Sequence, residues 1–223
     1  MSRIALLTGA SSGIGAAIAQ ALHEEGWRII APGRRPPSVP ATHIPVDLAT
    51  VSEAELASLL GDVRPDAFIH AAGLLRVAPL GQTERGIGQE LWRLHVDVAT
   101  MIANIVVPRM QAGGRVLLIG SRTANGAAGR SQYAASKAAL NGLVRSWAAE
   151  LAERNITANI IAPGATATPM LDDPARQGVP PRQPPIGRFI RPEEIAALAR
   201  FLLSPHAGAI TGQQIVVCGG ASL

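Results

Sequence analysis

The chain contains one tyrosine and one lysine, and these two residues, Tyr133 and Lys137, are four positions apart. In a helix, residues at this spacing lie on the same face. An ammonium beside a phenol favours the phenolate and lowers the phenol pKa from about 10 toward neutral pH. The pair therefore predicts a general acid/base that moves a proton to or from a carbonyl or alcohol oxygen. An ordinary polar pair on a helix surface remains the alternative interpretation.

A second motif, TGASSGIG at residues 8–15, lies between an apolar strand-like run and a helix-like stretch. Gly9 permits a tight turn, Gly13 lets backbone approach a pyrophosphate, and Gly15 lets the helix pack closely on the sheet. Backbone N–H groups at the start of the helix would hold the anion. Glycines also occur in loops for purely steric reasons, but in the first strand-to-helix turn of an α/β chain they predict dinucleotide binding.

Strand-like and helix-like segments alternate along the whole chain, and these elements must position both motifs. Strands are expected at 4–7, 27–31, 43–46, 67–70, 115–119, 157–161 and 214–217, and long helices at about 13–25, 88–110, 131–154 and 192–203. Short connections imply right-handed crossovers. The predicted fold class is α/β: a doubly wound Rossmann fold with a mostly parallel seven-stranded sheet and helices on both faces. One domain is expected over residues 1–223.

Composition narrows the possible partners. The net charge is +4, but the arginines are scattered and no run exceeds the pair Arg34 and Arg35, so nucleic acid is not an expected partner. No apolar run is long enough to span a bilayer, and the N-terminus lacks a signal-peptide pattern. The lone Cys218 cannot form an internal disulfide. We therefore expect a cytoplasmic protein that has no membrane partner and no metal site.

The two motifs, with Pro163-Gly164 and the threonines at 166 and 168, resemble the short-chain dehydrogenase/reductase family in order and spacing over residues 4–220. The resemblance implies hydride transfer between a nicotinamide cofactor and a carbonyl or secondary alcohol. It implies Tyr133 as the acid/base and Ser121 as the group that hydrogen-bonds the reacting oxygen. Lys137 would tune the tyrosine and hold the nicotinamide ribose. Ser121 lies one residue closer to Tyr133 than in many members, where Gly120 would fall; glycine has no hydroxyl, so we infer a shorter loop.

Motif and resemblance together predict a set of cofactor-binding residues. In chain order they are Thr8, Gly9, Ser11, Gly13, Ile14, Gly15, Arg34, Arg35, Asp47, Leu48, Ala72, Gly73, Tyr133, Lys137, Pro163, Gly164, Thr166 and Thr168. An acidic residue after the second strand would accept a hydrogen bond from a ribose hydroxyl, whereas arginine suits a 2′-phosphate. The two arginines at 34 and 35 therefore predict NADP (NADPH) rather than NAD, although Ser12 stands where some phosphate-preferring relatives have a second basic residue.

Two positions depart from the pattern of the family. His95 stands where the family commonly has an asparagine that supports a proton-relay water chain. A histidine can donate and accept, so a relay role is one hypothesis, and a core or solvated helix histidine is the other. Ala71 lacks the side chain that normally ties neighbouring strands together. These departures leave open a different class of function, a catalytically silent nucleotide-binding sensor or scaffold.

The substrate is expected to be a small-molecule carbonyl or alcohol whose identity the residues do not specify. The segment after Pro169 carries Met170, Leu171, Arg176 and Arg182, and Arg122 follows Ser121. These arginines suggest an anionic substrate, although simple solvation explains them equally well. The apolar, alanine-rich segment 134–152 predicts a homodimer or homotetramer; a helix buried within a monomer would show the same pattern.

Overall fold

The computed structural model describes residues 2–172 and 181–223 and shows one seven-stranded sheet. The strands are β1 (Ile4–Thr8), β2 (Arg28–Gly33), β3 (Thr42–Pro45), β4 (Ala67–His70), β5 (Arg115–Ile119), β6 (Thr157–Pro163) and β7 (Gln214–Val217). Their order is β3-β2-β1-β4-β5-β6-β7, and every neighbouring pair is parallel. The predicted α/β doubly wound fold is confirmed, and the sheet is fully parallel.

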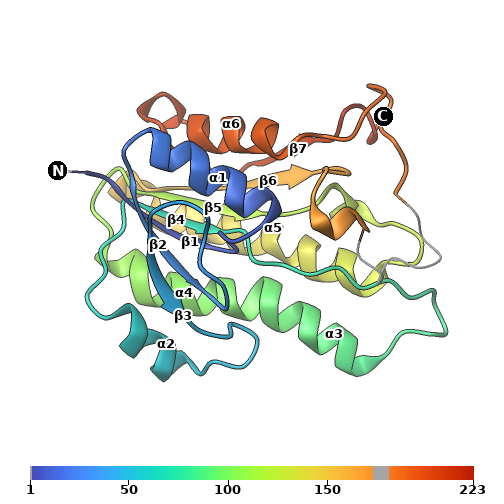
Figure 1. The fold of residues 1–223 in the computed structure, drawn as a ribbon, viewed down its shortest axis with the longest axis horizontal. Coiled ribbons are helices and arrows are strands. Elements are labelled where there is room, and N and C mark those ends of the chain that lie inside the picture. Colours follow the sequence, from blue (N-terminus) through green and yellow to red (C-terminus); the bar gives the residue numbers. More distant parts are fainter. Residues whose placement is uncertain (1, 173–180) are drawn as a thin grey trace.

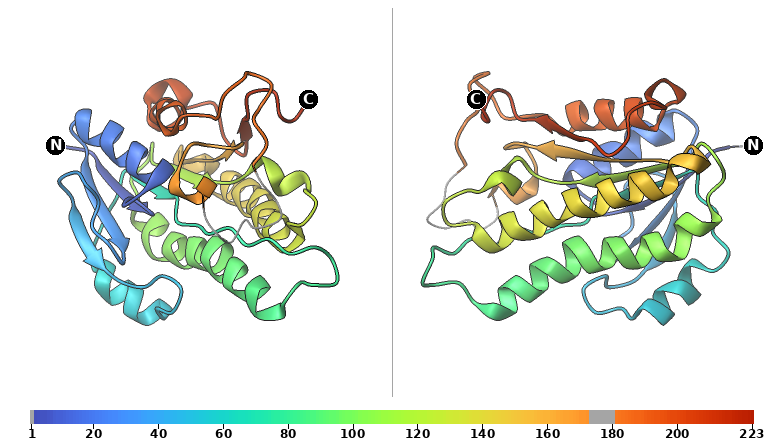
Figure 2. Two further views of the ribbon diagram at one scale, coloured as in Figure 1. Left: turned by 45° about the vertical axis from the view of Figure 1, so that its right-hand side comes forward. Right: turned by 180° about the vertical axis from the view of Figure 1, so that it is seen from behind.

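Helices cover both faces of this sheet (Figure 1). One face carries α1 (Gly13–Glu24) and α6 (Pro192–Leu203), which pack against each other. The other carries α2 (Glu53–Leu60), α4 (Val98–Val106) and α5 (Ser131–Leu151), with α3 (Arg85–Trp92) extending the line of α4 alongside α5 (Figure 2). Within residues 2–172 and 181–223, no helix combines the length and hydropathy needed to cross a bilayer.

Alternate residues of each strand enter the two apolar cores. In β1, Leu6 belongs to the core beneath α4 and α5, whereas Ala5 and Leu7 belong to the core beneath α1 and α6. The central strands are buried on both faces, which explains their nearly continuous apolar sequences. Most strand bounds differ from the predicted ones by only a residue or two.

The predicted helix at 88–110 is instead a series of helical segments. After α3 the chain forms a π-helical turn, η1 (Arg93–Asp97), then α4, and finally a 3-10 turn, η2 (Val107–Arg109). Proline at 108 lacks the N–H that would continue the α-helix, which accounts for the change at the end. A π-helical turn spans one more residue per hydrogen bond than an α-helical turn, and such turns are frequent at functional sites. Here it carries His95, whose ring bonds the turn after β4.

In the turn after β1, the backbone packs so closely that only glycine fits at two positions. A Cβ on Gly15 would lie 2.1 Å from the carbonyl oxygen of Gly9, and a Cβ on Gly9 would lie 2.6 Å from the backbone nitrogen of Ala72. Gly9 also has a φ of 72°, which L side chains rarely adopt. The turns after β1 and β4 are therefore in backbone contact. They meet where the strand order reverses, which is where open α/β sheets bind ligands.

Gly15→Ala should therefore destabilise the protein, because the added methyl overlaps backbone that cannot move aside. We expect urea unfolding to show a loss of about 2 kcal/mol or more. Gly86→Ala in α3 is the matched control, since a Cβ there meets no described atom within 4 Å. That variant should be unchanged or slightly stabilised, because alanine favours helix more than glycine does. Equal stability of the two variants would contradict the close packing at Gly15.

Candidate active site

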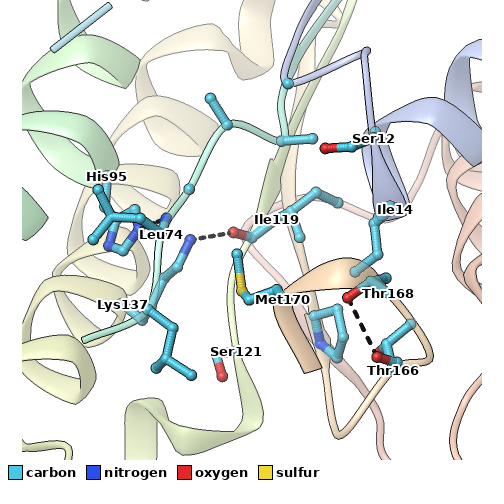
Figure 3. Close-up of a pocket in the computed structure, with 18 of the residues that line it drawn as sticks. Ser12, Ile14, Leu74, His95, Ile119, Ser121, Lys137, Thr166, Thr168 and Met170 are labelled. Carbon is cyan, nitrogen blue, oxygen red and sulfur yellow. Dashed lines mark hydrogen bonds between the residues drawn. The ribbon is translucent and has the colours of Figure 1, made fainter. Parts of the chain in front are cut away.

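A cavity of about 830 Å³ lies at the carboxyl edge of the sheet, where the turns after most of the strands meet. The side chains of Ser12, Ile14, Ser121, Lys137 and Thr168 surround it in Figure 3. Of the residues predicted to bind cofactor or take part in catalysis, all but Thr8 contribute to its lining. The structure thus brings together residues from both sequence motifs, from the strand ends and from the region around His95.

Thr8 has a different position from the one expected of a cofactor-binding residue, because its side chain is fully buried behind the cavity wall. Its hydroxyl accepts a hydrogen bond from the backbone N–H of Ala72 (3.1 Å) and donates one to Nδ1 of His70 (2.9 Å). Nε2 of His70 donates to the carbonyl of Leu94 (3.0 Å), which can only accept. Thr8 and His70 thus connect β1 to the turn after β4 and to η1 by hydrogen bonds. These bonds replace the connection that the side chain of Ala71 cannot make.

His70 is a neutral imidazole. Burial, together with the nearby charge of Lys137, lowers the pKa of His70 to about 3. The ring therefore has one N–H and one acceptor nitrogen at neutral pH, as its two hydrogen bonds require.

Tyr133 lies on the first turn of α5, and 9% of the residue is exposed. Its ring meets the ring of His95 edge to face, with centroids 5.6 Å apart and planes at 85°. Leu75 and Leu91 complete its apolar surroundings. The ring is thus held by packing while it borders the cavity.

Ser121 lies at the carboxyl end of β5 and borders the cavity, but its hydroxyl already has partners in its own turn. The oxygen accepts from the backbone N–H of Thr123 (3.2 Å) and shares a hydrogen bond with the Thr123 hydroxyl (2.8 Å). These contacts cap the 3-10 turn η3 (Arg122–Asn125). Thr123, which sequence reasoning missed, also lines the cavity and orients Ser121.

Lys137 lies one helical turn beyond Tyr133, and its ammonium donates to the carbonyl of Ile119 (2.8 Å; Figure 3). Burial lowers the pKa of Lys137 to about 7. A Cβ on Gly73 would lie 3.6 Å from the lysine Nζ and 3.2 Å from Nε2 of His95. Glycine at position 73 therefore leaves the space beside the ammonium open to the cavity.

His95 is fully buried, and protein groups engage both of its ring nitrogens. The backbone N–H of Leu74 donates to Nε2 (3.2 Å; Figure 3), so Nδ1 carries the proton and donates to Ser136 Oγ (2.9 Å). Ser136 in turn donates to the carbonyl of Tyr133 (2.9 Å). Burial, with the charge of Lys137 as a smaller cause, holds the pKa of His95 well below its usual range. These contacts match the interpretation of a satisfied core histidine; the relay role stays a hypothesis.

The comparisons with known proteins agree with this geometry. A family model described as enoyl-(acyl carrier protein) reductase matches residues 9–222. The short-chain reductase protein NovJ of Streptomyces niveus is 33% identical over 97% of this chain and 93% of its own length. The 3-oxoacyl-(acyl-carrier-protein) reductase FabG of Thermotoga maritima is 32% identical over 98% of this chain and 97% of its own. The chain belongs to the short-chain dehydrogenase/reductase family.

Two solved structures have the same fold. Aldohexose dehydrogenase from Thermoplasma acidophilum superimposes with a TM-score of 0.90 at 23% identity, covering 99% of this chain and 94% of that one. A blue fluorescent protein from a metagenomic library, solved in complex with NADPH, has a TM-score of 0.85 at 28% identity, covering 99% and 98%. The family model and the reductase relatives make this protein an oxidoreductase of the family.

The far end of the cavity in this short-chain dehydrogenase/reductase is lined by the turns after β2 and β3. Arg34 and Arg35 are exposed there, beside Asp47 and Leu48. The backbone N–H of Val46 donates to the carbonyl of Gly33 (3.2 Å), which joins the two turns. The pair of arginines predicted to select the cofactor is thus positioned at one end of the cavity, with Tyr133 and Ser121 also on its lining.

The segment expected to cover the substrate lies only partly within the described residues. Met170, Leu171 and Arg182 line the cavity, as does Arg122, whose guanidinium donates to the carbonyl of Ala221 (3.0 Å). Arg176 lies outside the described residues. One of the arginines noted in the sequence, Arg122, is thus bonded to the C-terminal segment.

The lowered pKa of Lys137 has a consequence for stability. The lysine pKa is about 7 in the folded protein and near 10.4 in an unfolded chain, so the unfolded state binds more protons between these values. The stability of the wild type relative to Lys137→Met should rise with pH from about 7 to about 10, by at most about 1.4 kcal/mol per pH unit. Urea unfolding of both proteins across this range measures the difference. A difference that does not vary with pH would contradict a buried lysine of low pKa.

Proposed function

We propose that this protein is a ketoreductase that transfers a hydride between NADP(H) and the carbonyl or secondary-alcohol carbon of a small molecule. The observation that carries the proposal is the shared cavity. Ser121, Tyr133 and Lys137 line the same space as the glycine-rich turn between β1 and α1. A protein that only binds nucleotide has no need of this trio, and the hydrogen bonds of Thr8 and His70 supply the connection that Ala71 lacks.

Glycines at two positions leave room in the cavity for a dinucleotide. A Cβ on Gly13 would lie 3.1 Å from Thr168 Cγ2, and a Cβ on Gly73 would occupy the space beside Lys137. Backbone N–H groups at the start of α1 suit the pyrophosphate. Thr166 and Thr168 would meet the carboxamide or the phosphates, and Lys137 would hold the nicotinamide ribose. When bound, the cofactor supplies or takes up the hydride.

The remaining steps belong to side chains of this protein. Ser121 hydrogen-bonds the oxygen of the reacting carbonyl and orients it, and Tyr133 gives that oxygen a proton during reduction or removes one during oxidation. Lys137, as an ammonium, stabilises the phenolate that forms when the proton leaves. The apolar side chains around Tyr133 exclude water from this step.

The preference for NADP(H) rests on Arg34 and Arg35, which line the cavity where no acidic side chain follows β2 in the sequence. Planar guanidinium groups match the geometry of a 2′-phosphate, whereas NAD binding would favour a carboxylate at this turn. The NADPH complex of the related blue fluorescent protein is consistent with this choice.

We also propose that the protein is a single-domain cytoplasmic enzyme whose copies associate as a homodimer or homotetramer through the long helices. The outer face of α5 is partly exposed and includes the half-buried Leu143 and Trp147. Small-molecule carbonyls or alcohols are the expected partners, and neither nucleic acid nor a membrane is.

Removal of the phenol hydroxyl tests the proton-transfer role. Purified protein with NADPH is first screened against neutral and acidic ketones, and Tyr133→Phe is then compared with wild type on the best substrate. We expect turnover to fall by roughly 10²–10⁴-fold, because the general acid is lost. The Kd of NADPH should change little. Full turnover by Tyr133→Phe would reject the mechanism; NADPH binding by a wild type inactive on every ketone would favour a silent sensor.

Cofactor choice is tested separately by the double substitution Arg34→Ala/Arg35→Ala. We expect kcat/KM with NADPH to fall roughly tenfold or more, because charge-assisted contacts to the 2′-phosphate are lost. The value with NADH should change far less. Arg28→Ala is the control, since Arg28 is exposed at the start of β2, the strand that precedes the two arginines, and lies outside the described lining of the cavity. A wild type with a higher kcat/KM for NADH than for NADPH would contradict the proposed cofactor.

A further inference from the structure

The first residue of the π-helical turn η1 reaches across to the turn that follows β3. The Nε of Arg93 donates to the carbonyl of Ala49 (3.3 Å), and its Nη2 donates to the carbonyl of Val51. Its Nη1 contacts the sulfur of Met101 (3.0 Å). Each of the three guanidinium nitrogens thus has a partner, and two of these partners are backbone carbonyls of one short turn.

This turn lines the cavity at the end of Arg34 and Arg35, where the 2′-phosphate is proposed to bind. The adenine is attached to the same ribose, so we call this end the adenine side. Val46, Asp47, Leu48 and Ala49 line the cavity. Within the turn, the carbonyl of Asp47 accepts from the N–H groups of Thr50 and Val51, and the Asp47 carboxylate accepts from the N–H of Ala49 (3.0 Å). These bonds shape the turn, but they do not attach it to the helical layer. Leu48 and Val51 pack into the core beneath α4 and α5, and Arg93 adds hydrogen bonds from the helical layer to the backbone carbonyls of the turn.

Arg93 itself is not part of the described lining of the cavity, so its effect on a ligand must act through the turn. Its two neighbours in η1 make contacts of the same kind elsewhere. The carbonyl of Leu94 accepts from His70, and the ring of His95 accepts from the N–H of Leu74. Three consecutive residues therefore contact the turn after β3, the buried end of β4 and the turn after β4, and the two turns border one site.

We propose that Arg93 is a positioning residue for dinucleotide binding: it holds the carbonyls of Ala49 and Val51 and so keeps the adenine-side turn in its binding conformation. This inference rests on the proposed function. Loss of the guanidinium leaves the two carbonyls without this donor and lets the turn move relative to η1. Affinity for the cofactor then falls, because part of the binding free energy is used to order the turn.

Arg154 provides a matched control. It is also a partly buried arginine that donates to two backbone carbonyls, those of Val107 and Met110, and it lies outside the described lining of the cavity. Arg93→Met and Arg154→Met therefore remove equivalent contacts, one beside the cavity and one far from it. General loss of stability should affect both variants, whereas a loss of cofactor affinity should appear only in Arg93→Met.

The test measures the Kd of NADPH by titration calorimetry for the full chain and its variants, with thermal unfolding in parallel. We expect the Kd to rise about tenfold in Arg93→Met, the change that corresponds to about 1.4 kcal/mol, and to change less than about twofold in Arg154→Met. Arg93→Lys should be intermediate, since one ammonium reaches one carbonyl. In steady-state kinetics, KM for NADPH should rise by a larger factor than kcat falls.

An unchanged Kd in folded Arg93→Met, or an equal rise in Arg154→Met, would overturn the inference. If Arg93→Met does not fold, Arg93→Gln carries the same expectation, because its amide is too short to reach both carbonyls. Wild-type protein that binds neither NADPH nor NADH would instead refute the proposed function, which distinguishes the two failures.

Discussion

A single buried ammonium governs the electrostatics of the site. Lys137 lies in the lining of the cavity, bonded to the carbonyl of Ile119, and burial brings its pKa to about 7. Two histidines, His70 and His95, are buried around it, and desolvation and the lysine charge both lower their pKa values. Three basic groups can share this interior only because the two imidazoles remain neutral. A charged imidazole here would add the cost of desolvation to repulsion from the lysine.

Because both imidazoles are neutral, the donor and the acceptor in each of their hydrogen bonds can be assigned. A neutral ring has one donor and one acceptor, so the carbonyl of Leu94 and the N–H of Leu74 determine which nitrogen of each histidine carries the proton. From there the bonds continue to Thr8 and to Ser136, and so to both the glycine-rich turn and the helix of Tyr133. The two sequence motifs, more than a hundred residues apart, are thus connected by polar contacts through the core.

The fold and the set of residues that line the site could largely be predicted from the sequence, because both depend on local patterns. Apolar runs that end in glycine mark buried parallel strands, and the ends of such strands must meet at one edge. Hydrogen-bond partners could not be predicted in this way. Nothing in the residues around 93–97 indicates a π-helical turn, and Thr8, within the dinucleotide motif, bonds the core because Ala72 and His70 lie behind it. For His95, the sequence left two interpretations open, and the positions of Leu74 and Ser136 favour the core histidine.

The Thr8–His70 pair also limits how this protein can be redesigned. The threonine hydroxyl accepts a hydrogen bond from the N–H of Ala72 and donates one to Nδ1 of His70. Valine in its place would leave both of these buried atoms without that partner. The energetic effects of substitutions at the two positions cannot simply be summed. Libraries that vary one of these positions alone will sample mostly damaged proteins, so the two are better treated as a single design variable.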